Sequence, residues 1–148
     1  SVEELTEIYT RASEEGIQVH HRGSGKSYGD AAMNTGGLIL DMRRMNRLLD
    51  FAPEDGIIET EPGFTIEDQW KTILPHGYWP AGVPGTMFPT LGGCAAMNIH
   101  GKNHTRRGGF GDSIIDADLL TPKGELIRIS PDENKELFQR MQVCNLFD

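Results

Sequence analysis

The stretch of sequence that decides the fold is RGSGKSYGD, residues 22–30. It follows a predicted short strand at residues 17–21 and contains Gly23, Gly25 and Gly29 among polar side chains. Glycine adopts positive φ angles without strain and lets a ligand approach the backbone, so such a loop can hold a phosphate group with its own N–H groups. The stretch therefore predicts a phosphate-binding loop, with an ordinary turn as the alternative.

Two familiar phosphate-binding motifs do not fit this loop. A P-loop needs a glycine five residues before Gly25, where the sequence has His20. A Rossmann fingerprint needs a third glycine where Tyr28 stands, and residues 34–37 leave no room for the helix that must follow. The loop therefore belongs to a different class of nucleotide site.

On both sides of this loop, the spacing of apolar residues predicts an α+β domain. The expected helices are residues 2–16, 65–77, 91–97 and 134–141. The expected strands are residues 17–21, 37–41, 48–51, 57–61, 113–120 and 125–130, the last two forming a hairpin around residues 122–124. The helix that begins at Thr65 is expected to turn Ile66, Trp70, Ile73 and Leu74 toward the core.

The composition excludes several classes of protein. Lys plus Arg total 14 and Asp plus Glu total 22, and the net charge of −8 argues against nucleic-acid binding, which needs a cationic surface. No apolar run approaches the roughly 20 residues of a transmembrane helix. Cys94 and Cys144 form neither a CxxC pair nor a metal-ligand spacing, which favours a reducing compartment. We expect a cytoplasmic protein, with peripheral membrane association as the alternative.

A pair of histidines raises the question of a metal site. His100 and His104 stand four residues apart, as two ligands on a helix would. Gly101 between them and the glycines after them argue against a helix, and no carboxylate or cysteine nearby completes a ligand set. No metal site is expected.

Glycine-rich segments recur at residues 22–30, 82–93 and 101–111. Each taken alone fits a turn, but several in one domain predict a long ligand wrapped by main chain. Their sequences, in order, resemble the FAD-binding domain of the vanillyl-alcohol oxidase superfamily. This domain is also called the PCMH-type domain of FAD-linked oxidases. The matching residues are Arg22 to Asp30, Pro84-Gly85-Thr86, Thr90-Leu91-Gly92-Gly93 and Ile99-His100-Gly101-Lys102-Asn103-His104.

The resemblance runs from about Ser1 to Phe138 and is strongest to the decaprenylphosphoryl-β-D-ribose oxidases. It implies two small α/β subdomains, about residues 1–52 and 53–148. After Phe138 the sequence departs from the glycine-rich continuation usual in the family. We therefore expect a domain truncated at its C-terminal end, without the family's substrate domain.

The resemblance also implies which residues hold FAD. Lys26 stands where many relatives carry the histidine that attaches FAD covalently, so non-covalent FAD is expected. Tyr28, His100 and Lys102 are the candidates for the active-site lining, and the proton acceptor is expected in the absent domain. For Tyr28 the alternative is a loop anchor packed on the core, and for Lys102 a solvated lysine. The implied cofactor contacts are Arg22, Gly23, Ser24, Gly25, Lys26, Ser27, Tyr28, Gly29, Asp30, Gly85, Thr90, Leu91, Gly92, Gly93, Met97, Asn98, Ile99 and His100.

The function implied is the FAD-binding portion of an oxidoreductase that oxidises a CH–OH group of a sugar or alcohol, including a lipid-linked ribose. Such a portion is expected to be inactive alone. The alternative is a catalytically inactive domain that folds and associates with itself through an exposed sheet edge.

Overall fold

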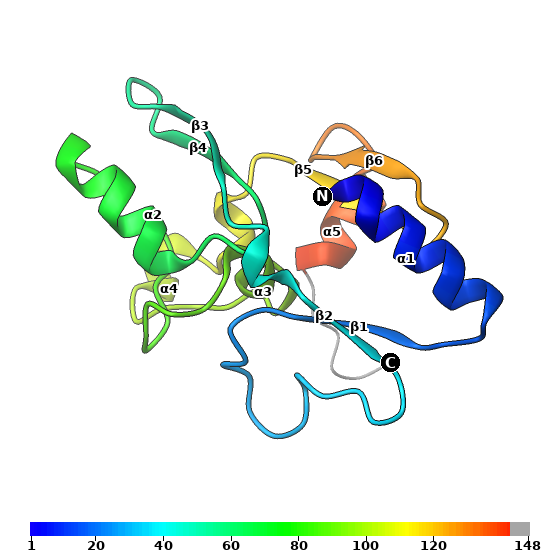
Figure 1. The fold of residues 1–148 in the computed structure, drawn as a ribbon. Coiled ribbons are helices and arrows are strands. Elements are labelled where there is room, and N and C mark those ends of the chain that lie inside the picture. The colour runs from blue at the N-terminus through cyan, green and yellow to red at the C-terminus, as the bar shows by residue number, and fades with distance from the viewer. Residues whose placement is uncertain (143–148) are drawn as a thin grey trace.

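The computed structural model describes residues 1–142 and confirms the predicted α+β class (Figure 1). Its helices are α1 (Val2–Glu14), α2 (Ile66–Ile73), α3 (Leu91–Ala96), α4 (His104–Arg107) and α5 (Lys135–Gln142), with short 3-10 turns η1 (Met42–Arg44), η2 (Leu74–His76) and η3 (Gly111–Ser113). Its strands are β1 (Val19–Arg22), β2 (Leu38–Asp41), β3 (Leu48–Ala52), β4 (Ile57–Thr60), β5 (Ala117–Leu120) and β6 (Leu126–Ile129). The predicted helices and strands are present, with ends shifted by a few residues.

The first helix is tied to the strand that leads into the glycine-rich loop. Ser1 and Glu4 form the capping box that starts α1, each accepting from the backbone of the other. Ala12 on its inner face is buried. The hydroxyl of Tyr9 hydrogen-bonds to Nε2 of His21 on β1. This side-chain contact adds to the short turn between helix and strand in fixing the start of β1.

The strands form two-stranded sheets within the described residues. β1 and β2 pair in parallel, with Val19 opposite Leu38 and Arg22 opposite Asp41. β3 pairs antiparallel with β4, and β5 with β6, so the predicted hairpin is confirmed. The loop at residues 22–30 therefore leaves from the carboxyl end of a hydrogen-bonded parallel strand, which fixes one end of the loop.

One apolar cluster lies under the second half of the chain. Ile66 at the start of α2, Cys94 on α3 and Phe110 before η3 are buried together. The half-buried side chains packed against them are Val83, Leu91, Ala95, Ile99 and Ile114. The cluster therefore gathers segments 82–93 and 98–111 around one core.

Three sequence-based expectations are corrected. Leu74 is 44% exposed, because α2 ends at Ile73 and the tighter η2 turn aims the next side chain outward. Trp70 is half-buried and packs edge-on against Trp79, with ring centroids 6.2 Å apart, instead of entering the core. The segment 101–111, whose glycines argued against a helix, contains the short helix α4.

A covered carboxylate holds the end of β4. Glu61 is 7% exposed, and its carboxylate accepts from the backbone N–H and the guanidinium of Arg47 at 2.7 to 3.0 Å. Arg47 itself is largely exposed, so solvent screens the pair. These hydrogen bonds hold the pKa of Glu61 below its ordinary value of 4.5.

We expect Arg47→Gln to lower the free energy of unfolding at neutral pH, because it leaves a covered carboxylate with fewer donors. A carboxyl group with a lowered folded-state pKa contributes stability above pH 4.5 that is lost as the pH falls through that lowered pKa. Urea unfolding of Arg47→Gln, Glu61→Gln and the parent at neutral and acid pH checks both the loss at Arg47 and the pH dependence from Glu61. The acid-dependent loss should shrink in the variant, and an equal loss in both proteins would contradict the assignment.

Candidate functional site

The loop at 22–30 lies against segment 82–93. The backbone of Gly23 packs so closely on the side chain of Thr90 that an added Cβ would overlap its Oγ1. Nζ of Lys26 lies 5.3 Å from the ring centroid of Phe88, a cation–π contact. Two contacts, at the start and middle of the loop, therefore bring the first two glycine-rich segments side by side.

Segment 82–93 in turn contacts the third glycine-rich segment. Nδ2 of Asn103 donates to the carbonyl of Ala81 at 3.0 Å. Gly101 is buried, and a Cβ there would lie 2.6 Å from the carbonyl oxygen of Val83. The structure thus brings the three predicted segments together, although they are far apart in sequence.

The loop at 22–30 presents an uninterrupted row of backbone donors. Within residues 1–142, no backbone N–H from Gly23 to Asp30 donates to a protein acceptor. Gly25 and Gly29 have φ angles of 62° and 63°, which L side chains rarely adopt. Arg22 folds beneath the loop, since a Cβ at Gly25 would lie 2.8 Å from its guanidinium Nη2. Free N–H groups beside one guanidinium fit the charge of a pyrophosphate.

The N-terminus of α3 differs from what we expected. Leu91, Gly92 and Gly93 are among the cofactor contacts that the resemblance implies, but the N–H of Leu91 donates to the carbonyl of Phe64 and that of Gly92 to the carbonyl of Pro62, at 2.7 and 2.8 Å. The N–H of Gly93 donates to Oγ1 of the N-cap Thr90. These hydrogen bonds hold α3 against the β4–α2 connection. The first N–H groups of this helix are therefore already bonded within the protein.

The residues expected near the flavin lie at and after the end of α3. Met97 and His100 are exposed, and Asn98 and Ile99 are half-buried. Asn98 has a φ of 37°, and its Oδ1 accepts the N–H of Gly111 at 2.8 Å, so its side chain braces the third segment. The chain reverses here, which places residues 97–100 at the surface of the apolar cluster.

The active-site candidates are all exposed on this chain. Tyr28 is 98% exposed, which contradicts the alternative that it anchors the loop on the core. Lys102 is also exposed, and the imidazoles of His100 and His104 have centroids 5.1 Å apart. Nδ1 of His104 hydrogen-bonds to the carbonyl of Gly101, which fixes that ring. These side chains are free to contact a ligand seated on the glycine-rich surface.

Other reactive groups are inert or distant. Burial raises the pKa of the Cys94 thiol to about 12, so it is neutral at physiological pH and no nucleophile. Cys144 lies outside the described residues. Within residues 1–142, no group of three His, Cys, Asp or Glu side chains has the geometry of a metal site. Every helix in this range is too short or too polar to cross a bilayer.

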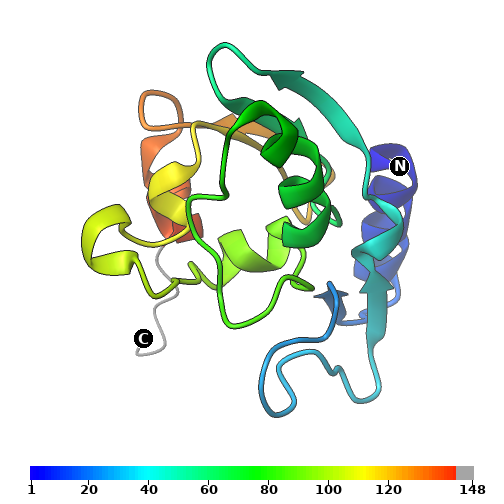
Figure 2. The ribbon, with the colours of Figure 1, turned by 90° about the vertical axis from the view of Figure 1, so that its left-hand side faces the viewer.

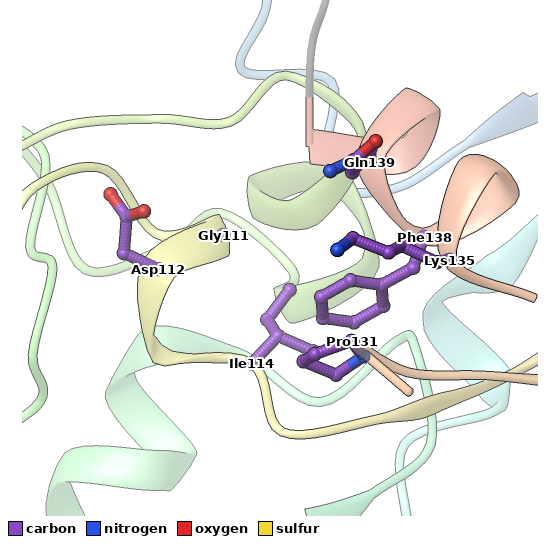
Figure 3. Close-up of a pocket in the computed structure, with 7 residues that line it drawn as sticks. All are labelled: Gly111, Asp112, Ile114, Pro131, Lys135, Phe138 and Gln139. Carbon is purple, nitrogen blue, oxygen red and sulfur yellow. The ribbon is translucent and has the colours of Figure 1, made fainter. Parts of the chain in front are cut away.

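A separate hollow of about 260 Å³ lies between η3 and α5 (Figure 3). Phe138, Ile114 and Pro131 form its apolar floor, and Asp112, Lys135 and Gln139 lie at its rim. None of the predicted site residues lines it, so it is not part of the candidate cofactor site.

Sequence reasoning missed two residues that shape the site. Phe88 holds Lys26, and Asn103 ties the third segment to the second. An aromatic residue inside a Gly- and Pro-rich segment was a usable signal for Phe88. No sequence signal distinguishes the structural amide of Asn103 from an exposed one.

The chain is similar to flavoproteins. A model of the FAD binding domain family matches residues 1–130. Decaprenylphosphoryl-β-D-ribose oxidase of Mycolicibacterium smegmatis is 40% identical over 130 residues, an alignment covering 87% of this chain and 28% of that protein. L-gulonolactone oxidase of Bos taurus is 28% identical over 143 residues, covering 97% of this chain and 32% of that protein. The chain thus spans about three tenths of the length of these relatives.

Solved structures show the same fold. 6-Hydroxy-D-nicotine oxidase of Arthrobacter nicotinovorans superposes with a TM-score of 0.88 at 25% identity, over 96% of this chain and 31% of that one. Xylooligosaccharide oxidase of Myceliophthora thermophila superposes with a TM-score of 0.85 at 23% identity, over 96% of this chain and 30% of that one. The second likeness is evidence for the fold alone.

Proposed function

Because this chain belongs to the FAD binding domain family, with the PCMH-type fold of the vanillyl-alcohol oxidase superfamily, we propose that it is the cofactor-holding part of an oxidoreductase acting on a CH–OH group. FAD is the cofactor of this family. The observation that carries the proposal for this chain is the row of free N–H groups from Gly23 to Asp30, packed beside Arg22 and against Thr90.

The residues have distinct roles in this proposal. The loop at 22–30 and the guanidinium of Arg22 hold the pyrophosphate, while segments 85–93 and 97–100 run along the rest of the cofactor. Bound flavin supplies the hydride acceptor for oxidation of a carbinol carbon. Tyr28, His100 and Lys102 line the reacting region, where the ammonium of Lys102 stabilises negative charge on the donor oxygen.

The proposed site predicts that the diphosphate part of FAD adds measurably to its affinity. Each hydrogen bond to a charged group contributes about 1.5–3 kcal/mol, so FAD should bind at least about 100-fold more tightly than riboflavin, which lacks phosphate. Fluorescence titration of the purified chain with both flavins measures the ratio. Equal affinity for FAD and riboflavin would contradict the assigned role of the loop.

We propose that FAD is bound without a covalent bond. Lys26 occupies the place of the attaching histidine, and the two histidines before the loop are engaged elsewhere. Nε2 of His20 lies 2.9 Å from the carbonyl oxygen of Ala31, and His21 contacts Tyr9.

Acid precipitation of the FAD-loaded chain tests this proposal. All of the flavin absorbance should remain in the supernatant, because only non-covalent contacts hold it. Flavin fluorescence that migrates with the chain on a denaturing gel would contradict the prediction, and a Lys26→Ala sample loaded with FAD is the control for non-specific carry-over.

The substrate proposed for the whole enzyme is a sugar or alcohol, including a lipid-linked ribose. It is supported by the 40% identity to decaprenylphosphoryl-β-D-ribose oxidase and the 28% identity to L-gulonolactone oxidase. Since the match covers under a third of either relative, we propose that the substrate domain and the proton acceptor are not among these residues, and that this portion alone is inactive.

We also propose the division into subdomains at about residues 1–52 and 53–148. Helix α1 and the β1–β2 sheet belong to the first, and the apolar cluster to the second. The β3–β4 hairpin spans the proposed boundary, with Ala52 paired to Ile57, so we assign it as the connection between the two parts.

A second candidate is a folded module that associates with itself and carries no cofactor. Apolar side chains at the edges of the two-stranded sheets favour it, with Leu38, Leu48, Leu49 and Ile57 between 38% and 50% exposed. Sedimentation velocity with and without FAD separates the candidates. Concentration-dependent association without flavin binding supports the second candidate, and a monomer that carries flavin supports the first.

A further inference from the structure

A cationic hollow lies at α4, in a chain whose net charge is −8. It has a volume of about 420 Å³ and is lined by Asn103, Arg106 and Arg107. Lys102 comes directly before Asn103, His104 lies between Asn103 and Arg106, and all five residues are exposed. Positive charge is therefore concentrated around one hollow of an otherwise acidic protein.

The two arginines of this hollow lack acidic partners in the described part of the chain. Across residues 1–142, neither Arg106 nor Arg107 forms an ion pair or a side-chain hydrogen bond. By contrast, Arg47 and Arg128 each pair with a carboxylate at 2.7 Å. The carboxylate that follows α4, on Asp112, accepts the N–H of Gly109 at 2.7 Å.

The turn that carries the arginines is held in place by other residues. Asn103 donates to Ala81, and His104 contacts the carbonyl of Gly101. Gly108, with a φ of 74°, ends α4. Both guanidinium groups line the same hollow on this fixed turn, and two like charges lining one hollow repel each other unless an anion enters.

We propose that this hollow binds a phosphate group, with the guanidinium groups of Arg106 and Arg107 as donors. Guanidinium is a planar fork of donors that matches the oxygens of a phosphate bidentately, which a lysine cannot do. In the proposed enzyme, this arginine pair selects a phosphorylated donor or a lipid headgroup beside the reacting region. That role rests on the proposed function.

The location separates this phosphate from those of FAD. Figures 1 and 2 both show α4 and the 23–37 connection, which contains the pyrophosphate loop, on different sides of α3. Lys102, an active-site candidate, comes directly before the hollow in sequence. The hollow is thus assigned to a group other than the cofactor's pyrophosphate.

The test uses two double variants with the same change in net charge. Arg106→Gln with Arg107→Gln removes the proposed donors, and Arg11→Gln with Arg140→Gln removes two exposed arginines that pair within their own helices. Binding of inorganic phosphate is measured by calorimetry on the chain with saturating FAD and without FAD. Sedimentation with phosphatidylglycerol or phosphatidylcholine vesicles forms the second arm.

We expect the first double variant to weaken phosphate binding about tenfold or more and the second by less than about twofold. If the first variant loses only phosphatidylglycerol binding, the phosphate group belongs to a lipid headgroup. If the first variant loses inorganic phosphate binding, the phosphate group belongs to a soluble ligand. Absence of binding in both arms, equal loss in both variants, or weaker FAD binding in the first variant alone overturns the proposal. Phosphate binding is also measured without FAD. If the chain does not bind FAD, the phosphate result still decides the proposal for the hollow.

Discussion

Replacing Gly23 with alanine is expected to lower the affinity for FAD about 100-fold. The new Cβ would overlap Oγ1 of Thr90, a buried side chain that caps α3 and cannot rotate away without losing its bond to Gly93. The loop must therefore move off α3, and losing two charge-assisted hydrogen bonds to the pyrophosphate costs about 3 kcal/mol. Fluorescence titration with FAD measures the change.

The matched control is Gly82→Ala, in another glycine-rich segment. Its Cβ would meet Phe110 at 3.6 Å, an ordinary contact, so affinity should change little. A second check is the pair Gly23→Ala with Thr90→Ala, which removes the overlapping hydroxyl. If the double variant binds FAD more tightly than the summed losses of the two single variants predict, the overlap with the hydroxyl is the cause. Unchanged FAD affinity in Gly23→Ala refutes that cause.

Gly92→Ala is expected to destabilise the fold by about 2–3 kcal/mol. Helix propensity alone predicts a gain of about 1 kcal/mol for this change in a helix. The Cβ, however, would lie 2.7 Å from Cβ and 3.0 Å from the carbonyl oxygen of Pro62, a rigid neighbour. Relief of that overlap separates α3 from the β4–α2 connection and strains the hydrogen bonds to Pro62 and Phe64.

Urea unfolding, monitored by circular dichroism, measures the expected loss of stability in Gly92→Ala. Gly85→Ala is the control, because nothing lies within 4 Å of its added Cβ. The loss at Gly92 would be a large share of a typical domain's 5–15 kcal/mol, so this variant should also express poorly. A more stable Gly92→Ala protein would show that helix propensity outweighs the packing on Pro62.

Most of the fold was predictable because its elements are specified locally. Ser1 and Glu4 mark the start of α1, and Thr65 and Asp68 form a second capping box at α2. Alternation and turn residues predict the β5–β6 hairpin. The error at Leu74 arose because helical periodicity was continued past the end of α2 into η2. Periodicity cannot signal where a helix tightens.

The candidate site was predictable only in part. Glycine-rich loops and their order identified the loop at 22–30 and its family. The contacts of Gly23 with Thr90 and of Gly101 with Val83 depend on the tertiary arrangement, which no local pattern encodes. The hydrogen bonds of the first α3 amides were not predictable for the same reason, since the carbonyls of Pro62 and Phe64 reach them from a distant segment.

The central claim is that this chain holds FAD through the loop at 22–30. The direct measurement is gel filtration of the purified chain after incubation with FAD, recording visible flavin absorbance across the protein peak. The account predicts flavin absorbance that co-elutes with the parent chain and with Gly82→Ala, and that is lost from Gly23→Ala. A folded parent chain that elutes colourless, with all flavin in the small-molecule volume, would contradict it.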